Sequence, residues 1–234
     1  MTTTPAPPLD PAPRPVVAMV LYQGMTLLDL IGPHTAFAAS MELHLVASTM
    51  DDVVCDTGVR VRPETTFADA PGDVDVLFVP GGPGTAGAMG DARLLDFLAD
   101  RGARARYVTA VCTGSIVLGT AGLLEGYRAT THWTHLDLLP LFGAQPVAER
   151  VVSDRNRITG GGVTAGIDFG LTLLEQMQGR RAAEVAQLSM EYDPHPPLDS
   201  GSPRTADPAV VAMVESFTAP GLDAVRAAWQ QVSR

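Results

Sequence analysis

The sequence has little cysteine, few positive charges and no long apolar segment. Cys55 and Cys112 are the only cysteines in 234 residues, a content typical of intracellular proteins, whose thiols stay reduced. No apolar run approaches the roughly 20 residues that span a bilayer, and the Thr-, Pro- and Ala-rich residues 1–15 lack the apolar region of a signal peptide. These absences predict a cytoplasmic protein.

The charge balance disfavours two classes of partner. The chain carries 26 acidic and 16 basic residues, a net charge of −10, and such a surface repels phosphate backbones and anionic lipid. Its five histidines and two cysteines show no metal-site spacing, and no phosphate-binding loop or dinucleotide fingerprint follows a strand. We therefore expect no nucleic acid, no membrane and no metal.

Strand-length apolar runs alternate with segments of helical spacing. Residues 16–22 and 74–79 are continuous apolar runs, as expected of strands buried on both faces of a parallel sheet. Further strands are predicted at 41–48 and 105–111, and a hairpin at 151–158. Helices are predicted over 91–104, 116–121, 136–141 and 164–177. The alternation predicts an α/β protein with a doubly wound, mostly parallel sheet.

The two ends of the chain depart from this pattern. Residues 1–14 contain five prolines and almost no large apolar side chain, which predicts a disordered tail. Residues 15–192 hold the alternating segments and form one predicted domain. Residues 193–234 look helical but are interrupted by prolines, and they have too little core to fold alone. We expect this extension to pack on the same domain or on a partner subunit.

Cys112 is the strongest candidate for a catalytic residue. A predicted strand runs directly into Cys112, Thr113 and Gly114 at the start of a helix, a turn that works like the nucleophile elbow of hydrolases. The helix N-terminus favours thiolate over thiol, so we expect a nucleophilic cysteine at the exposed rim of the sheet. The alternative is a buried structural cysteine. Cys55 lies beside acidic residues that raise a thiol pKa, and we expect no catalytic role for it.

Asp29 is the second candidate, because it is a carboxylate within the apolar stretch 27–31. Open α/β sheets bind ligands at the carboxyl ends of their strands, where Cys112 is also expected. An apolar pocket and a nearby thiolate would raise the pKa of Asp29 and let it exchange protons near neutrality. The alternative is an N-cap for a helix that has Pro33 in its first turn and continues through Ala39.

Glycines and one histidine complete the set of candidates. Gly81 and Gly82 follow a strand at the same sheet edge, and glycine lets backbone N–H groups approach a ligand as an oxyanion site requires. A plain turn is the alternative, and the run 160–162 carries a weaker signal. His132 follows the short predicted strand 128–131 and can neighbour Cys112, although a lone histidine is more often structural. No spacing fixes a Cys/His/Asp triad.

These motifs together resemble the ThiJ/PfpI superfamily. The resemblance is carried by the sequences VCTGS at 111–115, RATTHW at 128–133 and TGGGVTAGIDF at 159–169, with LDL at 28–30 and PGG at 80–82. It extends over nearly everything after the first 14 residues. It implies a flavodoxin-like fold, a homodimer and no metal or organic cofactor.

Within the superfamily the chain is most similar to the isocyanide hydratases. These have Asp at the position of Asp29, where many other members have Glu. They also have Thr directly after the cysteine, as this chain has at Thr113. This resemblance implies hydration of an isocyanide to an N-substituted formamide. Cys112 would attack the terminal carbon to form a covalent thioimidate, and Asp29 would transfer protons and activate water. Thr113 would position the carboxylate or the intermediate, and N–H groups of the elbow and of Gly82 would stabilise developing charge.

Three other functions stay open. Superfamily members with glyoxalase-like or deglycase activity act on 2-oxoaldehydes, but they ordinarily carry Glu where this chain has Asp29. The sensory half of certain AraC-like transcription factors resembles the same motifs, yet the segment after Tyr192 is short and weakly basic for a DNA-binding half. A redox sensor would use reversible oxidation of Cys112.

Overall fold

The centre of the molecule is a seven-stranded sheet with the strand order β10–β11–β7–β6–β1–β2–β5. The structure, a computed structural model, describes residues 14–232, so the tail predicted at residues 1–14 lies outside the described residues except for its last position. Neighbouring strands are parallel except in the β10–β11 hairpin. The strands are β1 (Val16–Val20), β2 (Glu42–Ala47), β5 (Thr65–Thr66), β6 (Val76–Val79), β7 (Tyr107–Val111), β10 (Val151–Asp154) and β11 (Arg157–Gly160). The predicted α/β fold is confirmed.

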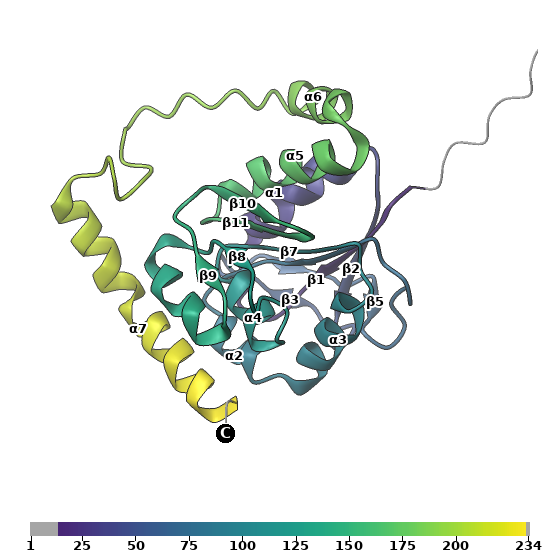
Figure 1. Cartoon of the computed structure of the whole chain (residues 1–234), viewed down its shortest axis with the longest axis horizontal. Coiled ribbons are helices and arrows are strands. Elements are labelled where there is room, and N and C mark those ends of the chain that lie inside the picture. The colour runs from purple at the N-terminus through teal and green to yellow at the C-terminus, as the bar shows by residue number, and fades with distance from the viewer. Residues whose placement is uncertain (1–13, 233–234) are drawn as a thin grey trace, which may run out of the picture.

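Helices cover both faces of this sheet (Figure 1). One face carries α1 (Leu27–Phe37), α5 (Ala165–Gln178) and α6 (Arg180–Ser189), and the other carries α2 (Thr85–Met89), α3 (Ala92–Gly102) and α4 (Gly114–Thr120). Phe169 of α5 joins the layers, because its ring stacks on Phe78 of β6 at 5.6 Å and meets Phe37 of α1 edge-on at 6.3 Å. The continuous apolar strands are therefore buried from both sides, as their sequence predicts.

Smaller elements flank the sheet. β3 (Val53–Val54) and β4 (Arg60–Val61) form a hairpin, β8 (Arg128–Ala129) pairs with β9 (Gln145–Pro146), and η1 (Trp133–Phe142) is a 3-10 helix. The helix predicted at residues 136–141 is thus this longer 3-10 helix. It places Thr131 and His132 immediately before a helical turn, next to the active-site elements described below.

The start of α1 differs from its prediction. The helix begins at Leu27, and Pro33 lies inside it rather than in its first turn. The Leu27 N–H donates to Oδ1 of Asp56, in the β3–β4 turn, over 3.1 Å, and this distant carboxylate satisfies a helix-start N–H that the local sequence leaves unpaired. Asp29 is therefore a first-turn residue, and its alternative role as N-cap is wrong.

The C-terminal segment ends in one long helix, α7 (Pro208–Val232), which contains Pro220. It contacts α2 and η1 of the same chain, and Figure 1 shows it along one side of the molecule after an extended connector. Val225 is buried, and the Trp229 ring meets Phe142 of η1 at 4.7 Å in a T-shaped pair. Within residues 14–232, no helix has the length and hydropathy of a membrane span.

Candidate active site

Cys112 follows β7 in a turn that few residues other than glycine adopt. Its φ is 56°, in the left-handed region, which costs free energy for a residue with a Cβ and marks sites where surrounding contacts hold the backbone. Its N–H donates to the carbonyls of Gly160 and Gly161 at 3.0 and 2.9 Å, and its carbonyl accepts the Thr131 hydroxyl at 2.8 Å. The predicted strand-to-helix turn is present, but the residue is buried, with 5% of its surface exposed, rather than at an exposed rim.

The turn after β6 lies directly against the Cys112 turn. A methyl group at Gly81 would lie 2.4 Å from the Thr113 nitrogen and 2.8 Å from the Cys112 Cβ. Such distances are far below van der Waals contact, so no larger residue fits without moving one of the two turns. Gly81 therefore serves close approach of two backbone segments.

Asp29 reaches this junction from α1. Its side chain is fully buried, and Oδ2 accepts the Gly81 N–H at 2.9 Å. Burial raises the pKa of Asp29 to about 7, although the Gly81 N–H and the nearby Cys112 thiol favour the carboxylate. Among the residues that the structure describes, Oδ1 has no hydrogen-bond partner. A buried carboxylate oxygen without a partner is costly, and it is available to a proton or a ligand.

The electrostatics of Cys112 differ from the expectation. Burial raises the pKa of its thiol, and the adjacent Asp29 raises it further, while backbone N–H groups of Thr113 and Val163 favour the thiolate. The helix that follows, α4, has only seven residues, and burial is the largest cause of the shift. Two anions in contact in a buried site repel strongly, so Cys112 and Asp29 hold one proton between them over a wide range above the pKa of about 7.

The N–H groups of Gly81 and Gly82 are engaged with the protein rather than free for a ligand. Gly81 donates to Asp29, and Gly82 donates to Oγ1 of Thr113 at 2.8 Å. The Thr113 hydroxyl also meets that of Thr85 at 2.7 Å. The Gly82 N–H thus fixes the threonine that follows Cys112, and its role as an oxyanion donor stays a prediction.

Several residues of the site escaped the sequence analysis. Thr85 and Thr131 are buried and bond to the two turns. Tyr22 donates to the Pro80 carbonyl at 2.8 Å, and burial raises the pKa of its phenol. Val163, with φ at 32°, directs its N–H to the Cys112 sulfur. None belongs to a residue type or spacing that indicates catalysis, and only the order of the strands brings them to one edge of the sheet.

His132 lies against the glycine run that precedes α5. A methyl group at Gly162 would lie 2.5 Å from Cδ2 and 3.2 Å from Nε2 of its ring, so this glycine permits the close packing. Burial lowers the pKa of His132, which keeps the imidazole neutral at neutral pH. The weak signal at 160–162 thus has a structural basis, since the run contacts both Cys112 and His132.

Cys55 differs from Cys112 in its surroundings. It is buried in the β3–β4 hairpin, and burial together with Asp56 raises the pKa of its thiol. Within residues 14–232, no group of three or more His, Cys, Asp or Glu side chains is placed to hold a metal ion. The titratable chemistry at this sheet edge therefore centres on Asp29 and Cys112.

A family model matches the part of the chain that supplies the buried cysteine, the acid of α1 and the glycine turns between them. The DJ-1/PfpI family model matches residues 15–176. This chain belongs to the DJ-1/PfpI family. Its match spans β1 to most of α5 and includes every residue described above that contacts Cys112 or Asp29.

Two relatives resemble nearly the whole chain. The isonitrile hydratase of Pseudomonas putida is 50% identical over 208 residues, which cover 88% of this chain and 91% of that protein. The crystal structure of a ThiJ/PfpI family protein from Pseudomonas syringae superposes with a TM-score of 0.90 at 48% identity, covering 92% of this chain and 90% of that one. The transcriptional regulator GbdR of Pseudomonas aeruginosa is 30% identical over 203 residues, but this chain spans only 55% of its length.

Proposed function

We propose that this protein hydrates isocyanides (isonitriles) to N-substituted formamides, with Cys112 as nucleophile and Asp29 as proton carrier. The observation that carries the proposal is the buried Asp29–Cys112 pair, in which the carboxyl has a pKa of about 7 and an unpartnered oxygen. The 50% identity with an isonitrile hydratase over 88% of the chain supports the choice of substrate class.

The first step forms a carbon–sulfur bond. The terminal carbon of R–N≡C accepts the sulfur electron pair and takes the single proton of the Asp29–Cys112 pair, which gives the thioimidate R–N=CH–S–Cys112. The N–H groups of Thr113 and Val163 stabilise the thiolate before attack. Asp29 is then a carboxylate, and its free Oδ1 is the acceptor that the second step needs.

The second step consumes water. Asp29 removes one water proton as the oxygen attacks the thioimidate carbon and passes that same proton to the substrate nitrogen, which gives R–NH–CH(OH)–S–Cys112 and leaves Asp29 a carboxylate. Collapse releases R–NH–CHO, and the hydroxyl proton returns to the Asp29–Cys112 pair. The sum is one isocyanide plus one water giving one formamide, with the enzyme regenerated.

Thr113, Gly81, Gly82 and His132 complete the proposed site. Thr113 contributes its N–H to the sulfur, and its hydroxyl fixes the turn at Gly82. Gly81 orients Asp29 through its N–H. His132, whose ring packs on Gly162, is the proposed side-chain contact for the substrate.

The proposal extends to assembly and location. Leu28 and Ile31 are 41% and 40% exposed on α1, one helical turn apart, and this apolar face supports a homodimer built on α1. We place the catalytic unit at residues 15–192 with residues 193–234 as an extension, and the protein in the cytoplasm, acting without a cofactor on a small molecule.

The test is conversion of cyclohexyl or phenyl isocyanide to the formamide, followed by NMR with wild-type and Cys112→Ala protein. We expect turnover that the substitution abolishes and a mass increase of one isocyanide on wild-type enzyme quenched during turnover. Hydration that persists in Cys112→Ala overturns the mechanism. A wild-type protein that is inactive on isocyanides but converts 2-oxoaldehydes would place it with the glyoxalase-like members instead.

A further inference from the structure

One threonine joins two imidazole rings at the start of η1. Oγ1 of Thr134 lies 2.8 Å from Nδ1 of His132 and 2.8 Å from Nδ1 of His135. The backbone N–H of Thr134 also donates to Nδ1 of His132, at 3.4 Å. The two rings are close to perpendicular, with centroids 6.2 Å apart. A hydroxyl has one proton, so it donates to one ring and accepts from the other.

The backbone N–H decides the direction of this chain of bonds. Because an N–H only donates, Nδ1 of His132 is an acceptor, and a neutral imidazole with an unprotonated Nδ1 carries its proton on Nε2. The Thr134 hydroxyl then donates to His132 and accepts the Nδ1–H of His135. The two rings therefore have opposite tautomers.

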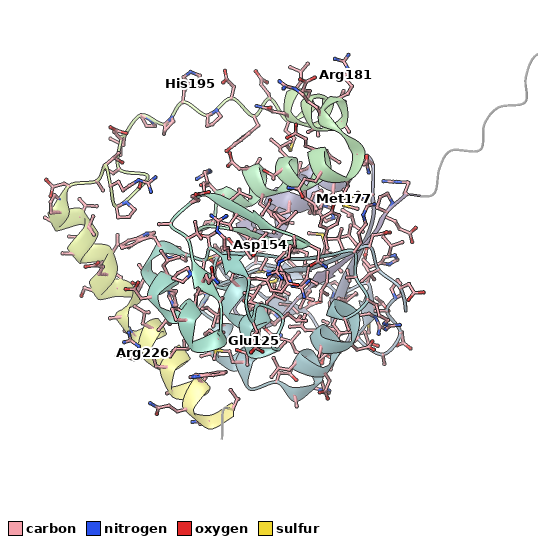
Figure 2. The ribbon with its side chains drawn as sticks, in the orientation of Figure 1. Glu125, Asp154, Met177, Arg181, His195 and Arg226 are labelled. Atoms are coloured by element: carbon pink, nitrogen blue, oxygen red, sulfur yellow. The ribbon has the colours of Figure 1, made fainter. Side chains whose placement is uncertain are left out.

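Both rings are held in the neutral form. Burial lowers the pKa of His132. Burial, the neighbouring His132 and the guanidinium of Arg226 lower the pKa of His135 to about 4. Arg226 belongs to α7 and is labelled on that helix in Figure 2, so the C-terminal helix contributes to the electrostatics of this cluster.

At one end of this series of hydrogen bonds, the Nε2 edge of His132 lies on the side of the active-site turns. It lies beside Gly162, whose neighbours Gly161 and Val163 bond to the Cys112 N–H and sulfur. Among the described residues, none makes a hydrogen bond to His132 Nε2. The structure thus offers a fixed N–H donor without a protein partner next to the segment that holds the nucleophile.

We propose that Thr134 and His135 are positioning residues that lock His132 as the neutral Nε2–H tautomer, and that this N–H donates a hydrogen bond to the nitrogen of the isocyanide-derived thioimidate. The second half rests on the proposed function. As water adds to the carbon, electron density builds on this nitrogen, and an N–H already oriented toward it stabilises that charge. A His132 with its proton on Nδ1 would present a lone pair to the nitrogen lone pair and repel it.

The tautomers are measured directly, without substrate. In ¹⁵N-histidine-labelled wild-type protein, two-bond ¹⁵N–¹H correlations distinguish Nε2–H from Nδ1–H rings, and His132→Gln and His135→Gln spectra assign the two signals. We expect Nε2–H for His132 and Nδ1–H for His135. Thr134→Val, which keeps the shape but removes the hydroxyl, should shift His132 toward a mixture of tautomers, and Thr134→Ser should restore the wild-type pattern. An Nδ1–H His132 in wild type, or an unchanged pattern in Thr134→Val, overturns the lock.

Kinetics test the role in the reaction. With cyclohexyl isocyanide we expect Thr134→Val to lower kcat in proportion to the share of His132 that leaves the Nε2–H form, up to about tenfold, which is the effect of losing one hydrogen bond in the transition state altogether. KM should stay nearly unchanged, and Thr134→Ser should be within about twofold of wild type. If NMR confirms the lock but wild type, Thr134→Val and Thr134→Ser have the same kcat, the proposed hydrogen bond from His132 to the substrate is overturned. Absence of isocyanide turnover in wild type would reject the proposed function, while the NMR result would still decide the tautomer lock.

Discussion

Gly81 donates its backbone N–H to Oδ2 of Asp29 over 2.9 Å, although 52 positions separate the two residues in the chain. The bond joins the turn after β6 to the first turn of α1. It fixes one carboxylate oxygen and leaves the other free beside Cys112. The geometry of the acid is thus set by a residue that has no functional group of its own.

The first prediction concerns the acid itself. Asp29→Asn should lower kcat/KM for isocyanide at least about 100-fold, because proton transfer by a positioned carboxyl contributes about that factor or more. Asp29→Glu should keep part of the activity, since a carboxyl remains but its longer side chain no longer fits the Gly81 N–H. Steady-state kinetics check both variants, and an Asp29→Asn enzyme within a factor of a few of wild type would contradict the assigned role.

The second prediction is the pH profile. The active form of the enzyme holds one proton on the Asp29–Cys112 pair, and it gains a second proton as the pH falls through the Asp29 pKa of about 7. The profile of kcat/KM should therefore fall on the acid side with a midpoint near pH 7. Because the pKa of Cys112 is raised, no alkaline decline should occur below about pH 9. A plateau that continues down to pH 5 would show that Asp29 titrates normally.

The third prediction links this titration to stability. A carboxyl whose pKa rises from 3.8 unfolded to about 7 folded binds more protons in the folded state between these values. Its contribution to stability is therefore complete below pH 4 and is lost as the pH rises through 7, by up to about 4 kcal/mol. Thermal melts should show that Asp29→Asn is more stable than wild type at pH 8, with the difference much smaller at pH 5. The same difference at both pH values would argue against a raised pKa.

The fourth prediction uses a matched pair of glycines. Gly81→Ala should lower the free energy of unfolding by about 1–3 kcal/mol and disrupt activity, because its methyl group meets the Thr113 nitrogen at 2.4 Å. Gly87→Ala in α2 has no atom within 4 Å of the new methyl group and should leave activity unchanged with equal or higher stability. Urea denaturation compares the two. Equal stability of both variants would mean that the turns at Gly81 and Cys112 separate easily.

The fifth prediction concerns the α1 face. Ile31→Arg places a charge on the proposed dimer surface, and light scattering coupled to gel filtration should show a monomer where wild type is a dimer. Leu188→Arg on α6, which is 81% exposed, is the control and should stay dimeric. If wild type is monomeric at micromolar concentration, α1 is not an interface between copies.

The sequence predicts those features that depend on neighbouring residues. The continuous apolar runs identify β1 and β6, and the succession of strand, Cys112, Thr113 and Gly114 identifies the turn. The features that the sequence does not predict depend on long-range contacts. The Asp56 bond moves the start of α1, and the N–H of Val163 approaches the sulfur only after β11 pairs with β7.

The direction of the pKa shift of Cys112 also depends on long-range contacts that the sequence does not predict. The sequence indicates a helix N-terminus beside the thiol, which favours the thiolate, but it does not indicate how deeply the thiol is buried or that Asp29 contacts it. In the folded protein these last two effects are larger, and the shift has the opposite sign. The Asp29–Cys112 pair, rather than the cysteine alone, is therefore the unit that titrates.

The carboxylate of Asp56 that receives the Leu27 N–H also has a practical consequence for protein engineering. The β3–β4 hairpin looks like a surface loop that tolerates exchange between homologues. Its turn, however, holds the first residue of the helix that carries Asp29, the proposed catalytic acid, two positions later. Loop grafting or random mutagenesis at residues 55–58 thus removes a contact that holds the start of α1, and libraries aimed at new substrates should keep Asp56 fixed.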